Sequence, residues 1–172
     1  MRKTNVKRGF TLVEMIVVIA IIALLATVVI FNVQEGKKKA RDAQRLSDLQ
    51  QIQLALRVYK DAHGRYPDMG CGRFDTDGIY WTGAHPSFGS CAVYIDNVTD
   101  FFKELPIDSN ENGYIYSSRN NGADYKIMAY QSVEKGIIPK GTPFARCDLS
   151  CTASYCDNQA TYAIYSPGAK CW

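Results

Sequence analysis

Histidine is scarce in this chain, which has only two, and both are remote from the cysteine cluster at residues 147–156. The Cys-x2-Cys pairs that are typical of structural zinc sites are missing as well. No serine–histidine–acid set stands in a supporting context, and no glycine-rich phosphate loop occurs. These absences exclude the common hydrolase and nucleotide-binding patterns. The sequence therefore predicts a protein that is not an enzyme.

A strong net charge is missing outside the first nine residues. The formal net charge is +3, but Arg2, Lys3, Lys7 and Arg8 all precede Phe10, and the remaining basic residues nearly balance the 17 acidic ones. Bulk electrostatic binding of nucleic acid needs a basic excess, so nucleic acid is not expected as the main partner. A second basic cluster at residues 37–41 is expected to contact lipid head groups, with DNA capture as the alternative.

The chain does have a long apolar run near its N-terminus. From Met15 to Phe31 only Thr27 is polar. With residues 10–14 the run has about 22 residues, and a helix of that length spans about 33 Å, enough to cross a bilayer. A cleaved secretory signal has a shorter apolar core with a small-x-small site after it. The run therefore predicts a retained anchor, and the basic leader predicts that residues 1–9 lie in the cytoplasm and the head outside.

One carboxylate, Glu14, stands near the start of this run. A charge in lipid is costly unless a cation or strong donor pairs with it. The alternative is a glutamate near the interface that simply reaches water. Glu14 is therefore a candidate functional residue.

The segment Lys7-Arg8-Gly9-Phe10-Thr11-Leu12-Val13-Glu14 resembles the class III signal of type IV pilins and pseudopilins. The resemblance implies that a prepilin peptidase cuts between Gly9 and Phe10 and methylates the new N-terminus. Glu14 then stands at the position of the family's glutamate. The amine that cleavage creates at Phe10 supplies a partner for Glu14 of a neighbouring helix, so the pair can fix the register of a filament.

One position departs from many type IV pilins, which carry a proline at the twenty-second mature residue. This chain has Phe31 there. Residues 32–36 contain the weak helix formers Asn32 and Gly36, which predict a loosened turn rather than a sharp kink.

The six cysteines all fall in the second half of the chain, beyond the anchor. An even number in that place predicts disulfides formed in an oxidising compartment. Six cysteines allow 15 pairings, so the connectivity stays open, and Cys71–Cys91 is the pairing to test first. A metal site at the last cluster is the less favoured alternative. The six candidates are Cys71, Cys91, Cys147, Cys151, Cys156 and Cys171.

The fold expected from the pattern and the resemblance is α+β and type IV pilin-like. Apolar residues recur every three or four positions and give an amphipathic helix with polar residues interleaved, such as Arg45 and Asp48. Gly64 and Pro67 end a helix that runs from about residue 10 to about residue 62. The apolar positions are Ala43, Leu46, Leu49, Ile52, Leu56 and Tyr59.

The head is expected to be a small antiparallel sheet laid on this helix, with a disulfide-stapled C-terminal region. Residues 68–100 are predicted to form a disulfide-pinned connecting region and residues 98–105 a short helix. Two alternating segments around Asn120-Asn121-Gly122 predict a hairpin, and residues 162–165 a third strand. The predicted parts are a cleaved leader (1–9), a hydrophobic transmembrane or filament-core helix (10–33), its amphipathic continuation (34–63) and the globular head (64–172).

Residues 108–113 match the first half of a calcium loop, with Asp108, Asn110 and Asn112 as candidate ligands. Arg119 stands where the full loop has a bidentate acid. A simple turn between helix and hairpin explains the same residues. No cofactor is expected, with calcium at this loop as the alternative.

The predicted function is that of a structural pilin, which polymerises through its N-terminal helix into a type IV pilus-like extracellular filament. The alternatives are a pseudopilin of a type II secretion system and a minor tip pilin that binds DNA or a surface. The resemblance implies further copies of the chain, the prepilin peptidase and N-methyltransferase, an inner-membrane assembly platform with its motor, and minor pilins as partners. The chain is expected in the cytoplasmic membrane before assembly and at the cell surface afterwards.

Overall fold

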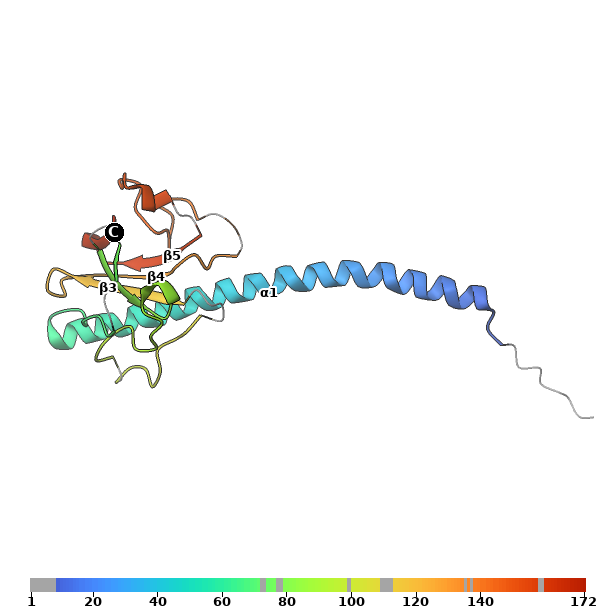
Figure 1. The fold of residues 1–172 in the computed structure, drawn as a ribbon, viewed down its shortest axis with the longest axis horizontal. Coiled ribbons are helices and arrows are strands. Elements are labelled where there is room, and N and C mark those ends of the chain that lie inside the picture. Colours follow the sequence, from blue (N-terminus) through green and yellow to red (C-terminus); the bar gives the residue numbers. More distant parts are fainter. Residues whose placement is uncertain are drawn as a thin grey trace, which may run out of the picture. The chain divides into compact units, whose positions relative to one another are not determined.

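The computed structural model describes residues 9–71, 74–76, 79–98, 100–108, 113–134, 136, 138–157 and 160–172. The chain divides into two compact units, Met1–Lys38 and Lys39–Trp172, which are considered separately. The second unit, called the head below, holds the C-terminal part of the long helix and the whole sheet (Figure 1).

The helix α1 runs over Leu12–His63 and has 52 residues. It ends at Gly64, which adopts φ 75° and donates its backbone N–H to the Lys60 carbonyl at 2.7 Å. This is the left-handed glycine cap that the sequence predicts. The expected loosened turn at residues 32–36 is wrong, because α1 is helical throughout that segment. One glycine in a helix costs only about 1 kcal/mol, which the flanking residues outweigh.

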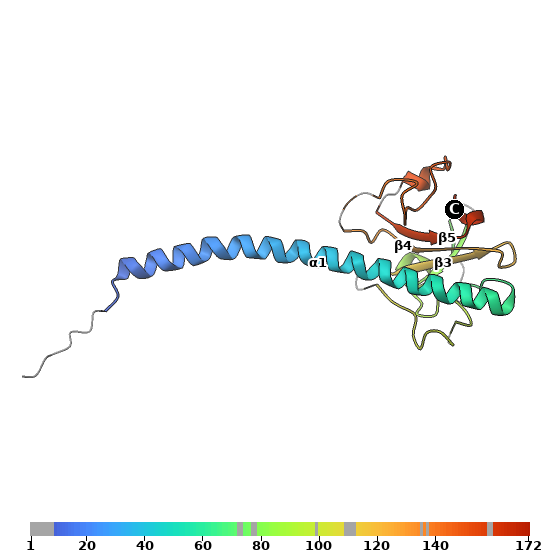
Figure 2. The same cartoon turned by 180° about the vertical axis from the view of Figure 1, so that it is seen from behind.

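The strands form one antiparallel sheet in the order β1-β2-β3-β4-β5. Figure 2 shows β3, β4 and β5 beside the C-terminal part of α1. Strands β2 to β5 form its four-stranded body, and β1 pairs with β2 at one edge. The strand bounds are β1 Phe74–Thr76, β2 Ile79–Gly83, β3 Tyr114–Arg119, β4 Asp124–Ala129 and β5 Tyr162–Tyr165. The 3-10 helices are η1 Pro86–Phe88, η2 Ser154–Asp157 and η3 Pro167–Ala169.

The predicted hairpin joins β3 to β4. Asn120, Asn121 and Gly122 adopt φ values of 55°, 56° and 77°, which asparagine and glycine tolerate best. The register places Tyr116 opposite Ile127, and Ile127 opposite Ile164 of the predicted third strand. The α+β prediction and these three strands are confirmed.

Alternation along the strands gives the sheet two buried faces. One face packs against α1 and contains Tyr114, Tyr116, Ile127 and Ile164. The helix side chains in this core are Leu49, Ile52, Leu56 and Tyr59. The other face contains Ile115, Met128 and Ala163, together with Trp81 and Phe88. Strands β3, β4 and β5 therefore each contribute to both cores, as a period of two requires.

Two local predictions are wrong. Residues 68–100 are not only a connection, because they contain β1, β2 and η1. Residues 98–105 contain no helix among their described members. There the Val98 carbonyl accepts bonds from the backbone N–H groups of Phe101 and Phe102, which makes a single turn. Asn97 at φ 54° and Pro106 bound a segment of under three turns, too short for a stable helix.

Candidate assembly site and its anchoring in the head

Glu14 lies in the first turn of α1 and caps it. Its Oε2 accepts hydrogen bonds from the backbone N–H and the Oγ1 of Thr11, both at 2.8 Å. The backbone N–H of Glu14 donates in return to Thr11 Oγ1 at 3.3 Å. This reciprocal arrangement in a Thr-x-x-Glu sequence is a capping box. In the full-length chain, Glu14 therefore has a partner in its own helix.

The bond between Gly9 and Phe10 lies just before this cap and is open to solvent. Both residues are exposed, and Phe10 retains 79% of its surface. A Cβ at Gly9 would meet no atom within 4 Å. The predicted cleavage point is thus sterically accessible.

The described side chains of α1 from Leu12 to Thr27 are all exposed within the chain. The helix contains one stretch that is long and apolar enough to cross a membrane. Exposed apolar surface of this extent is unusual for a soluble monomer and marks contact with lipid or with other protein. The chain itself supplies no cover for it among the described residues.

A buried cluster of charges fastens α1 to the loops of the head. Arg45 is 1% exposed; its Nη1 lies 2.7 Å from Asp42 and 3.1 Å from Glu134, and its Nε lies 2.8 Å from Asp108. Burial lowers the pKa of Arg45, but hydrogen bonds to these three carboxylates outweigh burial and raise the pKa above its ordinary value. Arg41 Nε adds a bond of 2.6 Å to Glu134. The cluster holds two distant loops against one turn of helix.

One turn further along, Asp48 joins α1 to the sheet. It accepts a hydrogen bond of 2.6 Å from the hydroxyl of Tyr114 on β3 and one of 2.7 Å from Gln44. Burial, aided by the bond to Asp48, raises the pKa of Tyr114. Asp48 is 7% exposed, so neither it nor Arg45 follows the simple pattern of interleaved surface charges.

Hydrophobic periodicity predicts neither the Arg45 contacts nor the Asp48 contacts, because it assigns charged residues to the surface. The sequence signal for Arg45 is a charged residue at a position that lies on the apolar face of the amphipathic helix. The capping box at Thr11 and Glu14 had a plain sequence signal, Thr-x-x-Glu before an apolar run.

The calcium prediction falls partly on this cluster. Asp108 uses one carboxylate oxygen in its bond to Arg45. Asn110 and Asn112 lie outside the described residues. Calcium at this loop stays a prediction.

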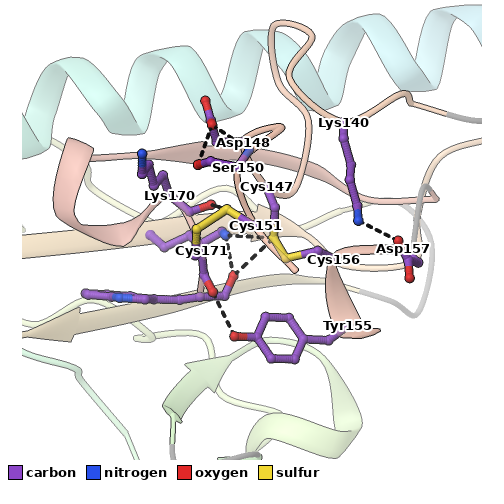
Figure 3. Close-up of a disulfide and its surroundings, with 12 residues drawn as sticks. Lys140, Cys147, Asp148, Ser150, Cys151, Tyr155, Cys156, Asp157, Lys170 and Cys171 are labelled. Carbon is purple, nitrogen blue, oxygen red and sulfur yellow. Dashed lines mark hydrogen bonds and ion pairs between the residues drawn. A yellow bond between two sulfur atoms is a disulfide. The ribbon is translucent and has the colours of Figure 1, made fainter. Parts of the chain in front are cut away.

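The cysteines form three disulfides. Cys71 pairs with Cys91, the pairing that the sequence puts first. Cys147 pairs with Cys156, and Cys151 with Cys171, so two interleaved bridges close the tail (Figure 3). The sulfurs of Cys147, Cys151 and Cys156 lie within 4.8 Å of one another, but each is bonded in a disulfide and is no thiolate ligand in this form.

The tail covers a buried lysine on β4. Lys126 is 0% exposed, and its ammonium group contacts the Trp172 carbonyl oxygen and lies 4.9 Å from the Tyr165 ring centroid. Burial, together with the charge of Arg146, lowers the pKa of Lys126 to about 7. The Tyr155 hydroxyl donates a hydrogen bond of 2.7 Å to the Cys171 carbonyl (Figure 3).

A family model described as the prokaryotic N-terminal methylation motif matches residues 4–30. The chain is 31% identical over 129 residues to the type II secretion system core protein G of Escherichia coli strain K12, a match covering 75% of this chain and 84% of that protein. The chain belongs to the core protein G family. Core protein G of Pectobacterium carotovorum is 43% identical over 61 residues, which cover 36% of this chain and 39% of that protein. The Vibrio cholerae protein is 36% identical over 67 residues, covering 39% and 46%. No solved structure matches the chain.

Membership of the core protein G family confirms the predicted relation to pilins and pseudopilins and the expected prepilin motif. It identifies a structural family and not an enzyme family. It also changes the order of the functional predictions. The sequence puts a type IV pilus subunit first, whereas the core protein G relatives favour the secretion pseudopilin that the sequence puts second.

Proposed function

We propose that this protein is a pseudopilin, a structural subunit that polymerises into the short filament of a type II secretion system. The observation that carries the proposal is the match to core protein G, which extends over 84% of that relative and so includes much of the head. The exposed apolar helix of the first unit supports it, because such a surface suits lipid before assembly and neighbouring helices after it.

Processing at Gly9 and pairing at Glu14 belong to this proposal. Cleavage gives Phe10 a positive α-amine at the start of α1, where the helix dipole disfavours a positive charge. A carboxylate of a neighbouring subunit offsets that cost. In the apolar filament core, a Glu14–Phe10 pair between subunits would neutralise both charges and fix the axial step of the helices.

The remaining partners follow from the same account. Before assembly, the chain would be anchored in the inner membrane with its head outside the cytoplasm. An oxidising compartment there permits its three disulfides. A prepilin peptidase and N-methyltransferase would act on Gly9 and Phe10. An assembly platform with its motor would extract the helix, and minor subunits would share the filament.

Deletion of the gene in the native cells tests this function. We expect proteins that normally reach the medium to accumulate behind the outer membrane, as measured by quantitative mass spectrometry of both fractions. The wild-type gene should restore export, and so should Leu149→Ala, a change at an exposed residue outside the helix. Normal export after deletion, with loss of surface pili instead, would favour the type IV pilus.

A further inference from the structure

An apolar groove opens in the head within residues 92–107, and nothing in the described chain fills it. The cavity measures about 160 Å³, room for an aliphatic side chain. Val93 and Ile107 in its lining are 57% and 60% exposed. We call this surface the loop groove; its lining includes Val93, Val98, Phe102, Lys103, Glu104 and Ile107.

A second apolar surface lies on the outer face of α1 in the head. Leu54 and Val58 are 65% and 42% exposed, while other large apolar side chains of this part of α1 are buried or half-buried. Arg57 and Asp61 are exposed on the same side. Positions 54, 57, 58 and 61 follow the i, i+3, i+4, i+7 spacing of one helix face. We call these four residues the helix stripe.

The two surfaces carry matching charges around their apolar centres. The helix stripe has a cation and an anion one turn apart, Arg57 and Asp61. The loop groove has Lys103 and Glu104, both exposed. None of these four side chains has an ion-pair partner within the described part of the chain. Two opposite-charge pairs can therefore form when the surfaces meet, which would orient the contact.

We infer that the helix stripe of one copy docks into the loop groove of the next copy, with the Leu54 side chain in the cavity. Both surfaces are exposed, so neither covers the other within one chain. Two different patches on one chain give a heterologous contact, in which the patch on one copy meets the other patch on the next copy. Repetition of such a contact builds an open helical assembly rather than a closed dimer. The inference rests on the proposed filament and adds the contact between heads to the contact between N-terminal helices.

Cysteine cross-linking in assembled filaments tests the contact. A chain carrying both Leu54→Cys and Ile107→Cys should give a covalent ladder of dimers, trimers and larger species after mild oxidation. Either single variant, and the pair Leu54→Cys with Leu149→Cys, should give no ladder. If filaments form but the first pair gives no more cross-linking than the control pair, the docking proposal is wrong and the proposed function stands. If the unaltered chain forms no filament, the proposed function itself fails.

Charge exchange gives a second readout that does not depend on new cysteines. Arg57→Glu and Glu104→Arg, each alone, should lower the yield of sheared filaments roughly tenfold, equivalent to about 1.4 kcal/mol at the contact. The two together should restore the yield. Lys170→Glu, an exposed change elsewhere, is the matched control and should have no effect. Equal loss in the double variant and in the two single variants would overturn the Arg57–Glu104 pairing and with it the docking.

Discussion

At Glu14, one carboxylate can serve two successive partners. In the uncut chain it closes a capping box with Thr11. After cleavage, we propose that it meets the amine of Phe10 on a neighbouring subunit. The two roles need different chemistry, because a capping box accepts glutamine as well as glutamate, whereas the pairing needs a negative charge.

Two substitutions separate these roles. Glu14→Gln keeps the cap and removes the charge, so we expect normal amounts of protein in the membrane and impaired assembly. Thr11→Ala weakens the cap by about 1 kcal/mol and keeps the charge, so filaments should still form. Immunoblots of membrane and sheared fractions measure both quantities. Full assembly by Glu14→Gln would show that the pairing is not needed.

Arg45 is the other residue on which a large energy depends. Arg45→Met leaves Asp42, Asp108 and Glu134 without their shared cation. Loss of one member of a buried ion pair costs about 3–5 kcal/mol, so the head should unfold at clearly lower urea concentration. Arg57→Met removes an exposed arginine of the same helix and should change stability by less than about 0.5 kcal/mol. Tryptophan fluorescence in detergent measures the urea midpoint of each variant. Equal midpoints for the two variants would contradict the structural role of the cluster.

At the scale of elements, the tail from Cys147 to Trp172 covers β4. Lys126 is buried beneath it with a pKa lowered to about 7, whereas an unfolded lysine titrates near about 10.4. Between these values the unfolded chain binds more protons than the folded one. Stability therefore rises with pH from about 7 toward 10, and it has no such dependence below about 7.

Lys126→Met tests this dependence because it removes the titrating group and keeps an unbranched side chain. The stability of wild type relative to the variant should increase by up to about 1.4 kcal/mol per pH unit between pH 7 and pH 9. Unfolding in urea at pH 7, 8 and 9 without reductant measures it. Parallel pH profiles for the two proteins would mean that Lys126 stays protonated in the fold.

Local sequence rules predict some elements of this fold well and others poorly. The β3–β4 hairpin was predictable, because Asn120, Asn121 and Gly122 mark a turn that neighbouring residues alone determine. Strand β2 was not, because it joins the body of the sheet through Thr82 and Gly83, which pair with β3 about 30 residues away. The wrong helix prediction at 98–105 also involves a contact from outside the segment, because the Tyr94 hydroxyl donates a hydrogen bond of 2.8 Å to the Pro106 carbonyl.

At the scale of the whole molecule, the two units meet different environments. The head has an apolar core on each face of its sheet and closes its tail with disulfides. The described apolar side chains of the first unit are exposed, so we infer that their partner comes from outside the chain. Lipid and a second copy are both apolar enough to be that partner. We propose that lipid around the apolar helix is exchanged for neighbouring copies of the helix during assembly.

A helical reconstruction of filaments sheared from cells that overproduce the chain tests the proposed exchange of lipid for neighbouring helices. We expect each subunit to begin at Phe10, the apolar helices to form the filament core, and each Glu14 carboxylate to lie within ion-pair distance of the Phe10 amine of a neighbour. Subunits that still carry residues 1–9, or a core in which Glu14 faces no neighbouring amine, would contradict it.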